Sequence, residues 1–78
     1  VQDKVRRLSI YPNPTQNEVA ISVQNYFGDL QAEIYDFTGS LLEANNSKTL
    51  SLLKYPKGIY LIRVIYGNQI EELKVVRE

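Results

Sequence analysis

The chain has 78 residues, carries nine Lys and Arg against nine Asp and Glu, and contains no Cys, His, Met or Trp. This composition excludes a disulfide framework, a zinc site built from Cys and His, and catalysis by an imidazole base or a thiol nucleophile. The net charge of zero argues against nucleic acid as a partner, because neutralisation of phosphates supplies most of the affinity of proteins that bind it.

The first predicted element is a short strand that ends in a proline-rich turn. Residues 8–11 alternate apolar and polar side chains, with Leu8 and Ile10 on the buried face. The run Tyr11-Pro12-Asn13-Pro14 follows. Each proline in it fixes φ at about −65° and removes a backbone N–H donor. The asparagine between them is a residue type whose side chain hydrogen-bonds the nearby backbone in turns. Segment 12–17 is therefore expected to form a sharp, stiff turn.

Two further strands with a period of two come next. Segments 18–23 and 30–36 both alternate apolar and polar residues, and a loop over 25–29 separates them. The residues expected to face inward are Val19, Ile21 and Val23 in the first of these strands and Leu30, Ala32 and Ile34 in the second. The second strand ends at the turn sequence Asp36-Phe37-Thr38-Gly39.

The middle of the chain predicts two short strands, over 40–44 and 49–52, on either side of a polar turn. The pattern then breaks at residues 54–58. There Pro56 cannot donate a ladder hydrogen bond, and Gly58 can adopt a positive φ.

The late part of the chain predicts a central strand and a closing hairpin. The strand that starts at Ile59 is apolar on both faces as far as Tyr66, and such strands occur in the middle of sheets. Gly67-Asn68 is typical of a two-residue hairpin loop of type II′. The final strand, over 69–77, is expected to turn Leu73 and Val75 inward.

These segments predict an all-β fold: a small immunoglobulin-like antiparallel β-sandwich of about six to seven strands with Greek-key connections. A chain of this length has room for one domain, which we place at residues 8–78, with residues 1–7 as linker or cleavage-region residues. The exposed sheet edges of so small a sandwich favour pairing with another strand, either in an edge-strand dimer or in a receptor.

Other partners and sites find little support in the sequence. Lys4, Arg6 and Arg7 form only a weak basic patch beside Asp3, which we interpret as solvated linker. No apolar run approaches the roughly 20 residues that a membrane-spanning helix needs, so direct membrane insertion is not expected. The acidic residues are scattered, which predicts neither a metal site nor a cofactor. A chain that begins at Val1 without methionine is expected to be a piece of a longer precursor.

Four runs in a fixed order carry a resemblance to a known family. They are Tyr11-Pro12-Asn13-Pro14, Ile34-Tyr35-Asp36-Phe37-Thr38-Gly39, Lys57-Gly58-Ile59-Tyr60-Leu61-Ile62-Arg63-Val64 and Lys74-Val75-Val76-Arg77. Together they resemble the landmarks of the type A C-terminal sorting domain of the type IX secretion system of Bacteroidetes. The resemblance extends from about Leu8 to Arg77.

The resemblance implies a sorting signal and not an enzyme. Domains of this family stand at the C-terminus of secreted enzymes and adhesins, behind a signal peptide and the cargo. They fold in the periplasm as immunoglobulin-like sandwiches and are recognised by the outer-membrane translocon. A gingipain-like sortase then cuts before the domain, and the cargo is released or attached to the cell surface. The implied location of the protein is therefore secreted or at the cell surface.

The same resemblance assigns candidate recognition residues. They are Pro12, Asn13 and Pro14, the central Gly39, the late Gly58 and Tyr60, and the terminal Lys74, Val75, Val76 and Arg77. Each also has a purely structural interpretation: a strand-ending turn for the prolines, a positive φ for the glycines, a core position for the tyrosine and a solubilising position on an edge strand for the lysine. Ser40 and Glu78 depart from the family, which often has Lys after the central glycine and a basic tail.

Two other functions stay open at this point. A carbohydrate-binding accessory module would need coplanar exposed rings, for which Tyr26, Phe27, Tyr35 and Tyr55 are the candidates. A passive spacer of the fibronectin type would need no terminal signal at all. An enzyme is the least favoured class, because a Ser or Thr nucleophile would need a Lys or carboxylate partner in a motif that does not occur here.

Overall fold

The computed structural model of this protein describes residues 7–78, and within that range it contains only strands, turns and loops. Of the expected linker residues 1–7, all but Arg7 lie outside the described range. The seven strands are β1 (Leu8–Tyr11), β2 (Glu18–Val23), β3 (Leu30–Asp36), β4 (Leu41–Asn45), β5 (Thr49–Ser51), β6 (Gly58–Tyr66) and β7 (Gln69–Arg77). No helix in the described part of the chain has the length and apolarity that crossing a bilayer requires.

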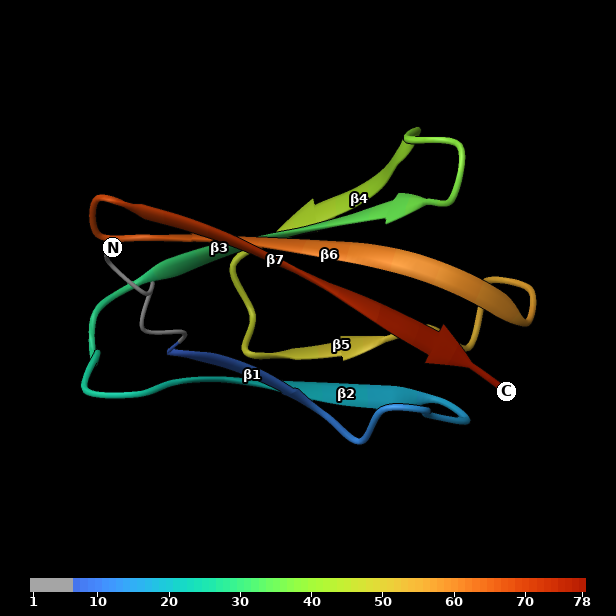
Figure 1. Cartoon of the computed structure of the whole chain (residues 1–78), viewed down its shortest axis with the longest axis horizontal. Coiled ribbons are helices and arrows are strands. Elements are labelled where there is room, and N and C mark those ends of the chain that lie inside the picture. Colours follow the sequence, from blue (N-terminus) through green and yellow to red (C-terminus); the bar gives the residue numbers. More distant parts are fainter. Residues whose placement is uncertain (1–6) are drawn as a thin grey trace, which may run out of the picture.

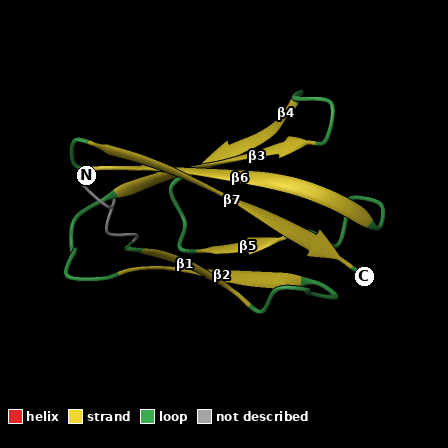
Figure 2. Ribbon diagram, viewed as in Figure 1, coloured by secondary structure: helices red, strands yellow, loops and turns green. Residues whose placement is uncertain are grey.

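The strands form two layers, which are visible one above the other in Figures 1 and 2. One sheet has the order β1-β2-β5 and the other the order β4-β3-β6-β7, with antiparallel pairing throughout both. The hairpins β1–β2, β3–β4 and β6–β7 each stay within one sheet, and the three remaining connections cross between the sheets. The predicted small all-β sandwich, immunoglobulin-like in its connections, is therefore confirmed.

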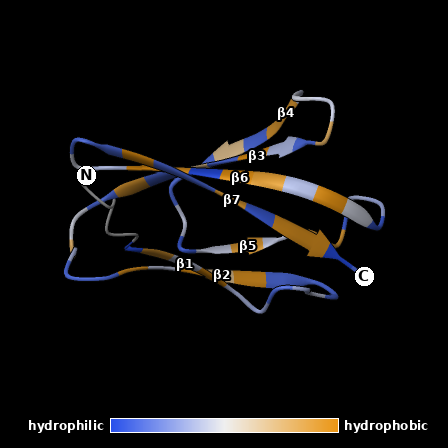
Figure 3. Ribbon diagram, in the orientation of Figure 1, coloured by the Kyte–Doolittle hydropathy of each residue, from blue (hydrophilic) through white to orange (hydrophobic). Residues whose placement is uncertain are grey.

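Alternation along the strands builds the core between the two sheets. The buried hydrophobic residues are Leu8, Ile10, Val19, Ile21, Leu30, Ala32, Ile34, Leu50, Leu52, Tyr60, Ile62, Val64, Tyr66 and Val75. Val23 and Leu73, which we expected to face inward, are partly buried and pack against this cluster. Hydrophobic segments lie on strands of both layers in Figure 3, as a core shared by two sheets requires.

The turns agree with the residue types found in them. β6 lies between β3 and β7, as its two apolar faces predicted. The β6–β7 loop places Tyr66 opposite Gln69, and Gly67 has a φ of 54° while Asn68 has no positive φ, which is the pattern of the expected type II′ turn. In the β3–β4 turn, Gly39 has a φ of 91°, and its N–H donates to the Asp36 carbonyl at 3.0 Å.

Three strands have boundaries that differ from the sequence prediction. One of them, β6, begins at Gly58, one residue earlier than expected. β4 begins one residue later than expected and includes Asn45, because Asn45 pairs with Ala32 of β3. β5 ends at Ser51, although the next residue, Leu52, is completely buried. The Leu52 N–H donates to the Asn17 carbonyl at 2.8 Å, so the backbone is still anchored to the β1–β2 connection after the strand ends.

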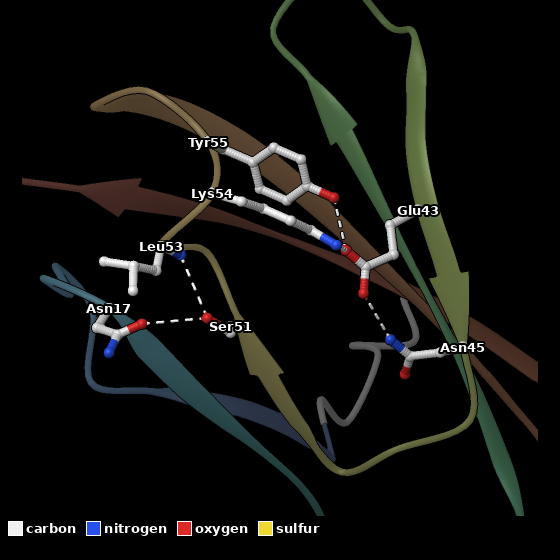
Figure 4. Close-up of polar contacts among 7 residues, drawn as sticks. All are labelled: Asn17, Glu43, Asn45, Ser51, Leu53, Lys54 and Tyr55. Carbon is white, nitrogen blue, oxygen red and sulfur yellow. Dashed lines mark hydrogen bonds and ion pairs between the residues drawn. The ribbon is translucent and has the colours of Figure 1, made fainter.

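A polar cluster on β4 holds this edge strand against the segment that precedes β6 (Figure 4). The Glu43 carboxylate accepts hydrogen bonds from Tyr55 Oη at 2.5 Å and Asn45 Nδ2 at 2.8 Å, and Lys54 Nζ lies 3.1 Å from it. The Tyr55 hydroxyl, together with Lys54, holds the pKa of Glu43 below its ordinary value. Burial and the nearby Glu43 carboxylate raise the pKa of Tyr55 to about 12.

The variant Glu43→Gln is expected to lose about 1–2 kcal/mol of unfolding free energy, because a charged acceptor of hydrogen bonds becomes neutral. It is also expected to lower the Tyr55 pKa, since the charged Glu43 carboxylate is one of the causes that raise this pKa. Urea denaturation and ultraviolet titration of the tyrosinates measure these two effects. Glu18→Gln, an exposed change on β2, is the matched control.

The same cluster predicts how stability depends on pH. The folded-state pKa of Glu43 lies below its ordinary value in the unfolded chain. Its stabilising contribution is therefore present above that ordinary value and disappears as the pH falls through the folded pKa. The Glu43→Gln variant should therefore lose less stability on acidification than the parent protein. An equal loss in both proteins would mean that the cluster adds nothing to the fold.

Candidate functional site

The proline-rich turn and the C-terminal strand form one structure, although they lie at opposite ends of the described chain. Asn13 Nδ2 donates to the Lys74 carbonyl at 2.8 Å, across 61 residues of sequence. The N–H of Val76 donates back to Asn13 Oδ1 at 3.0 Å. The side-chain amide of Asn13 therefore pairs with β7 through one donor and one acceptor, as the backbone of a neighbouring strand would.

Thr15 continues this pairing with its backbone. Its N–H donates to the Val76 carbonyl at 2.8 Å, and its carbonyl accepts from the Glu78 N–H, also at 2.8 Å. The Thr15 hydroxyl donates to the Glu18 carbonyl at 2.7 Å and accepts from the Asn17 N–H at 3.1 Å, which fixes the turn that leads into β2. Thr15 is only 3% exposed. The turn thus covers the outer edge of β7 over its C-terminal half.

The predicted recognition residues of the last strand face in different directions. Val75 is completely buried and belongs to the core, whereas Lys74 is exposed. Val76 and Arg77 are half-buried, and the buried Arg77 Nε has no hydrogen-bond partner among the described residues. The side chain of Lys74 is therefore the one in the run Lys74-Val75-Val76-Arg77 that extends fully into solvent.

The late motif lies beside the tail, and the central motif lies on the other side of the late motif. Gly58 pairs with Arg77 and Tyr60 with Val75 in the β6–β7 register. Tyr60 is 5% exposed and its hydroxyl donates to the Pro56 carbonyl, so this residue is part of the core. Gly39 lies in the β3–β4 turn. Asp36 of the second landmark pairs with Tyr60 in the β3–β6 register. The structure therefore places all four landmarks at the same end of the sandwich, with β6 between the second landmark and the tail.

The central motif is organised around the Asp36 carboxylate. Its Oδ1 atom accepts hydrogen bonds from the Thr38 hydroxyl at 2.6 Å, the Thr38 N–H at 2.9 Å and the Ser40 N–H at 3.0 Å. The hydrogen bond from the Thr38 hydroxyl, followed by those from the backbone, lowers the pKa of Asp36. Ser40, which differs from the family's usual Lys, contributes its backbone N–H to this turn, and a backbone group is available from any residue other than proline.

The four aromatic candidates for sugar binding occupy separate environments. Tyr26 packs on Tyr66 with ring centroids 5.1 Å apart, and Tyr55 packs on Tyr60 at 5.9 Å. Tyr35 lies with the Arg63 guanidinium 5.5 Å from its ring centroid. Phe27 is 93% exposed, in the loop between β2 and β3. The described residues therefore offer no shared flat platform of these four rings.

Sequence reasoning did not single out Thr15, which is as important as Asn13 in holding the tail. Thr15 lies in a turn, three residues before a strand. Threonine side chains at such positions often hydrogen-bond the nearby backbone, so the local sequence did indicate this role. Its backbone partner is Val76, and no local pattern points to a residue so far along the chain. Within residues 7–78, no group of three or more acidic side chains is placed to hold a metal ion.

Comparison with known families gives a match over nearly the whole described chain. A family model described as "Secretion system C-terminal sorting domain" matches residues 9–78. This range begins within β1 and includes the proline-rich turn, the central turn, β6 and the complete tail. A comparison with the curated proteins gave no match for the chain.

Proposed function

The chain belongs to the family of secretion system C-terminal sorting domains, the sorting signals of type IX secretion, and from this membership we propose how it acts. Residues 8–78 form the sorting domain of a longer precursor. The domain directs the upstream cargo through the outer-membrane translocon, and a gingipain-like sortase then removes it. The cargo reaches the medium or the cell surface.

One observation supports this proposal above the others: Asn13 donates a hydrogen bond to the Lys74 carbonyl and accepts one from the Val76 N–H, which joins the first and last landmarks of the family into one surface. A signal distributed over two ends of the chain requires such a junction to be recognised as a unit. A passive spacer has no need for a well-defined C-terminal end of this kind. The exposed ammonium group of Lys74 is the part of this surface that a partner reaches most easily.

The substitution Lys74→Glu is expected to reduce export of a periplasmic reporter fused before residue 1 by roughly tenfold, in a Bacteroidetes cell with type IX secretion. A reversed charge at a contact desolvated by the receptor costs a kcal/mol or more, which corresponds to about that factor. Because Lys74 is exposed, the circular dichroism spectrum and the urea midpoint should not change. Reporter activity in the medium and in the periplasm measures the effect.

Lys48→Glu, an exposed change in the turn between β4 and β5, is the matched control and should be exported normally. Normal export of the Lys74→Glu fusion would reject a role for the tail side chains. Normal export of a fusion that lacks the whole domain would reject the sorting function itself. Mass spectrometry of the released reporter tests the sortase step, because cleavage before the domain leaves the reporter without residues 8–78.

We also propose that a strand from another molecule pairs with the first half of β7. That strand comes either from a second copy of the chain, which gives an edge-strand dimer, or from a receptor. The backbone groups of Lys74 and Val76 that point outward are bonded to the proline-rich turn. Because the backbone N–H and C=O groups alternate in direction along a strand of an antiparallel ladder, those of Ile70 and Glu72 also point away from β6. Sedimentation equilibrium of the purified domain detects such a dimer.

A further inference from the structure

The two outward faces of the sandwich differ in chemistry. The outer face of the three-stranded sheet carries mainly small or polar residues: Ser9, Glu18, Ala20, Ser22, Thr49 and Ser51, with Tyr11 as its one large side chain. The outer face of the four-stranded sheet carries the aliphatic residues Leu41, Ile59, Leu61, Ile65, Ile70 and Val76, together with Tyr35. We call this second set the aliphatic face.

The strand register places these residues side by side. Leu61 of β6 lies opposite Tyr35 of β3 and opposite Lys74 of β7. Directly paired residues of antiparallel strands project on the same face, so these side chains share a row across the sheet. Ile59 lies opposite Val76 in the next row, towards the C-terminal end of β7. Ile59, Leu61 and Val76 therefore adjoin Tyr35 and Lys74 at this end of the sheet. The charged row of Glu33, Arg63 and Glu72 separates them from Ile65 and Ile70.

The described residues cover the aliphatic face only in part, since Tyr35, Leu61, Ile65 and Val76 are half-buried. Leu41 is 54% exposed, Ile59 48% and Ile70 61%. A strand that is apolar on both faces, as β6 is, normally has both faces covered, and here the sandwich covers only one (Figure 3). Exposed apolar surface of this kind typically marks an interaction site.

One row of the outer face of the four-stranded sheet is charged. Arg63 Nε lies 3.0 Å from Glu72 Oε2, and its guanidinium is 3.9 Å from Glu33 Oε1. One guanidinium is shared by two carboxylates, so this row keeps one net negative charge, and a partner that covers it meets a desolvation cost. Lys74, at the border of the face, takes part in none of the ion pairs of residues 7–78. A partner that fits is apolar and has an acidic group opposite Lys74.

We propose that the aliphatic face is the surface through which this domain docks on its secretion receptor, and this inference rests on the function proposed above. Lys74 and Val76 of the tail are themselves part of the face or its border. A receptor that contacts the tail therefore also meets Ile59 and Leu61.

The size of the face favours such a receptor over a second copy of the chain. Four strands spaced about 4.8 Å apart are about 15 Å across, and the nine residues of β6 are about 30 Å long. The resulting area of about 450 Å² falls short of the roughly 800 Å² per partner in a standard interface. A receptor that extends over the β7 edge and the proline-rich turn adds the missing area, whereas a face-to-face copy does not.

The test compares two double variants in the reporter fusion. Ile59→Thr with Leu61→Thr removes two apolar side chains from the face and keeps residue types that favour strands. Phe27→Thr with Leu53→Thr removes two apolar side chains that are 93% and 62% exposed outside it. Export is expected to fall by roughly tenfold in the first variant and to stay at the parent level in the second. Both purified domains should keep the parent's circular dichroism spectrum.

Three outcomes are informative. Equal export of both double variants, with the parent fusion exported, would overturn the docking face and leave the sorting function intact. Failure of the parent fusion to leave the cell would instead reject the sorting function. A parent dimer in sedimentation equilibrium that the first variant abolishes would assign the face to a second copy and overturn the proposal. If the first variant does not fold, the single change Leu41→Thr on β4 tests the same face.

Discussion

Deletion of residues 74–78 is expected to unfold the domain, and the loss of export that it causes will not by itself identify a signal. The deletion removes Val75, which is completely buried, and with it four rungs of the β6–β7 register. It also removes every partner of Asn13 and of the Thr15 backbone. The free-energy cost of losing a buried Val together with these hydrogen bonds exceeds the unfolding free energy of roughly 3–5 kcal/mol expected for a domain of this size.

Circular dichroism and urea denaturation of the shortened protein measure this effect. The companion variant Asn13→Asp keeps the acceptor for the Val76 N–H and replaces the donor to the Lys74 carbonyl with a charge that repels it. It should lower the urea midpoint while the tail sequence stays complete, and Asn46→Asp in the β4–β5 turn should not. A shortened domain that unfolds cooperatively at the parent's midpoint would show that the tail is not part of the fold.

Apolar and polar residues alternate along the strands, and this alternation explains why so much of the fold could be predicted. The burial of Val19, Ile21 and Ile34 depends only on local alternation, because a strand that packs on one side must turn every second residue inward. The hairpin between β6 and β7 was likewise predicted from two residues alone, Gly67 and Asn68. These features need no knowledge of what lies across the sandwich.

The recognition surface could be predicted only in part, because its geometry depends on contacts distant in sequence. The resemblance named Asn13 and Lys74 as separate landmarks, yet it is their hydrogen bond across 61 residues that makes them one surface. The aliphatic face was hidden for a related reason. The pattern of β6 shows two apolar faces, but only the arrangement of the sheets reveals that, within residues 7–78, no second sheet packs on the outward one.

Ile62→Ala is expected to abolish export while every residue of the tail stays in place. Ile62 is completely buried at the centre of β6, opposite Ile34 and Leu73. Truncation of a buried Ile to Ala typically costs about 2–5 kcal/mol, because the cavity that it leaves closes only partly. That cost is comparable with the whole stability expected of a domain of this size. The variant should therefore be largely unfolded, as urea denaturation and circular dichroism can measure.

The consequence for export separates two ways in which the receptor could recognise this domain. If it binds the folded surface that joins the proline-rich turn to β7, the Ile62→Ala fusion remains in the periplasm, because unfolding separates the two. The exposed change Leu53→Ala, outside the aliphatic face, should cost within about 0.5 kcal/mol and serves as the stability control. Normal export of an unfolded Ile62→Ala domain would show that the tail acts as a linear signal, and recognition would then be independent of the sandwich that presents it.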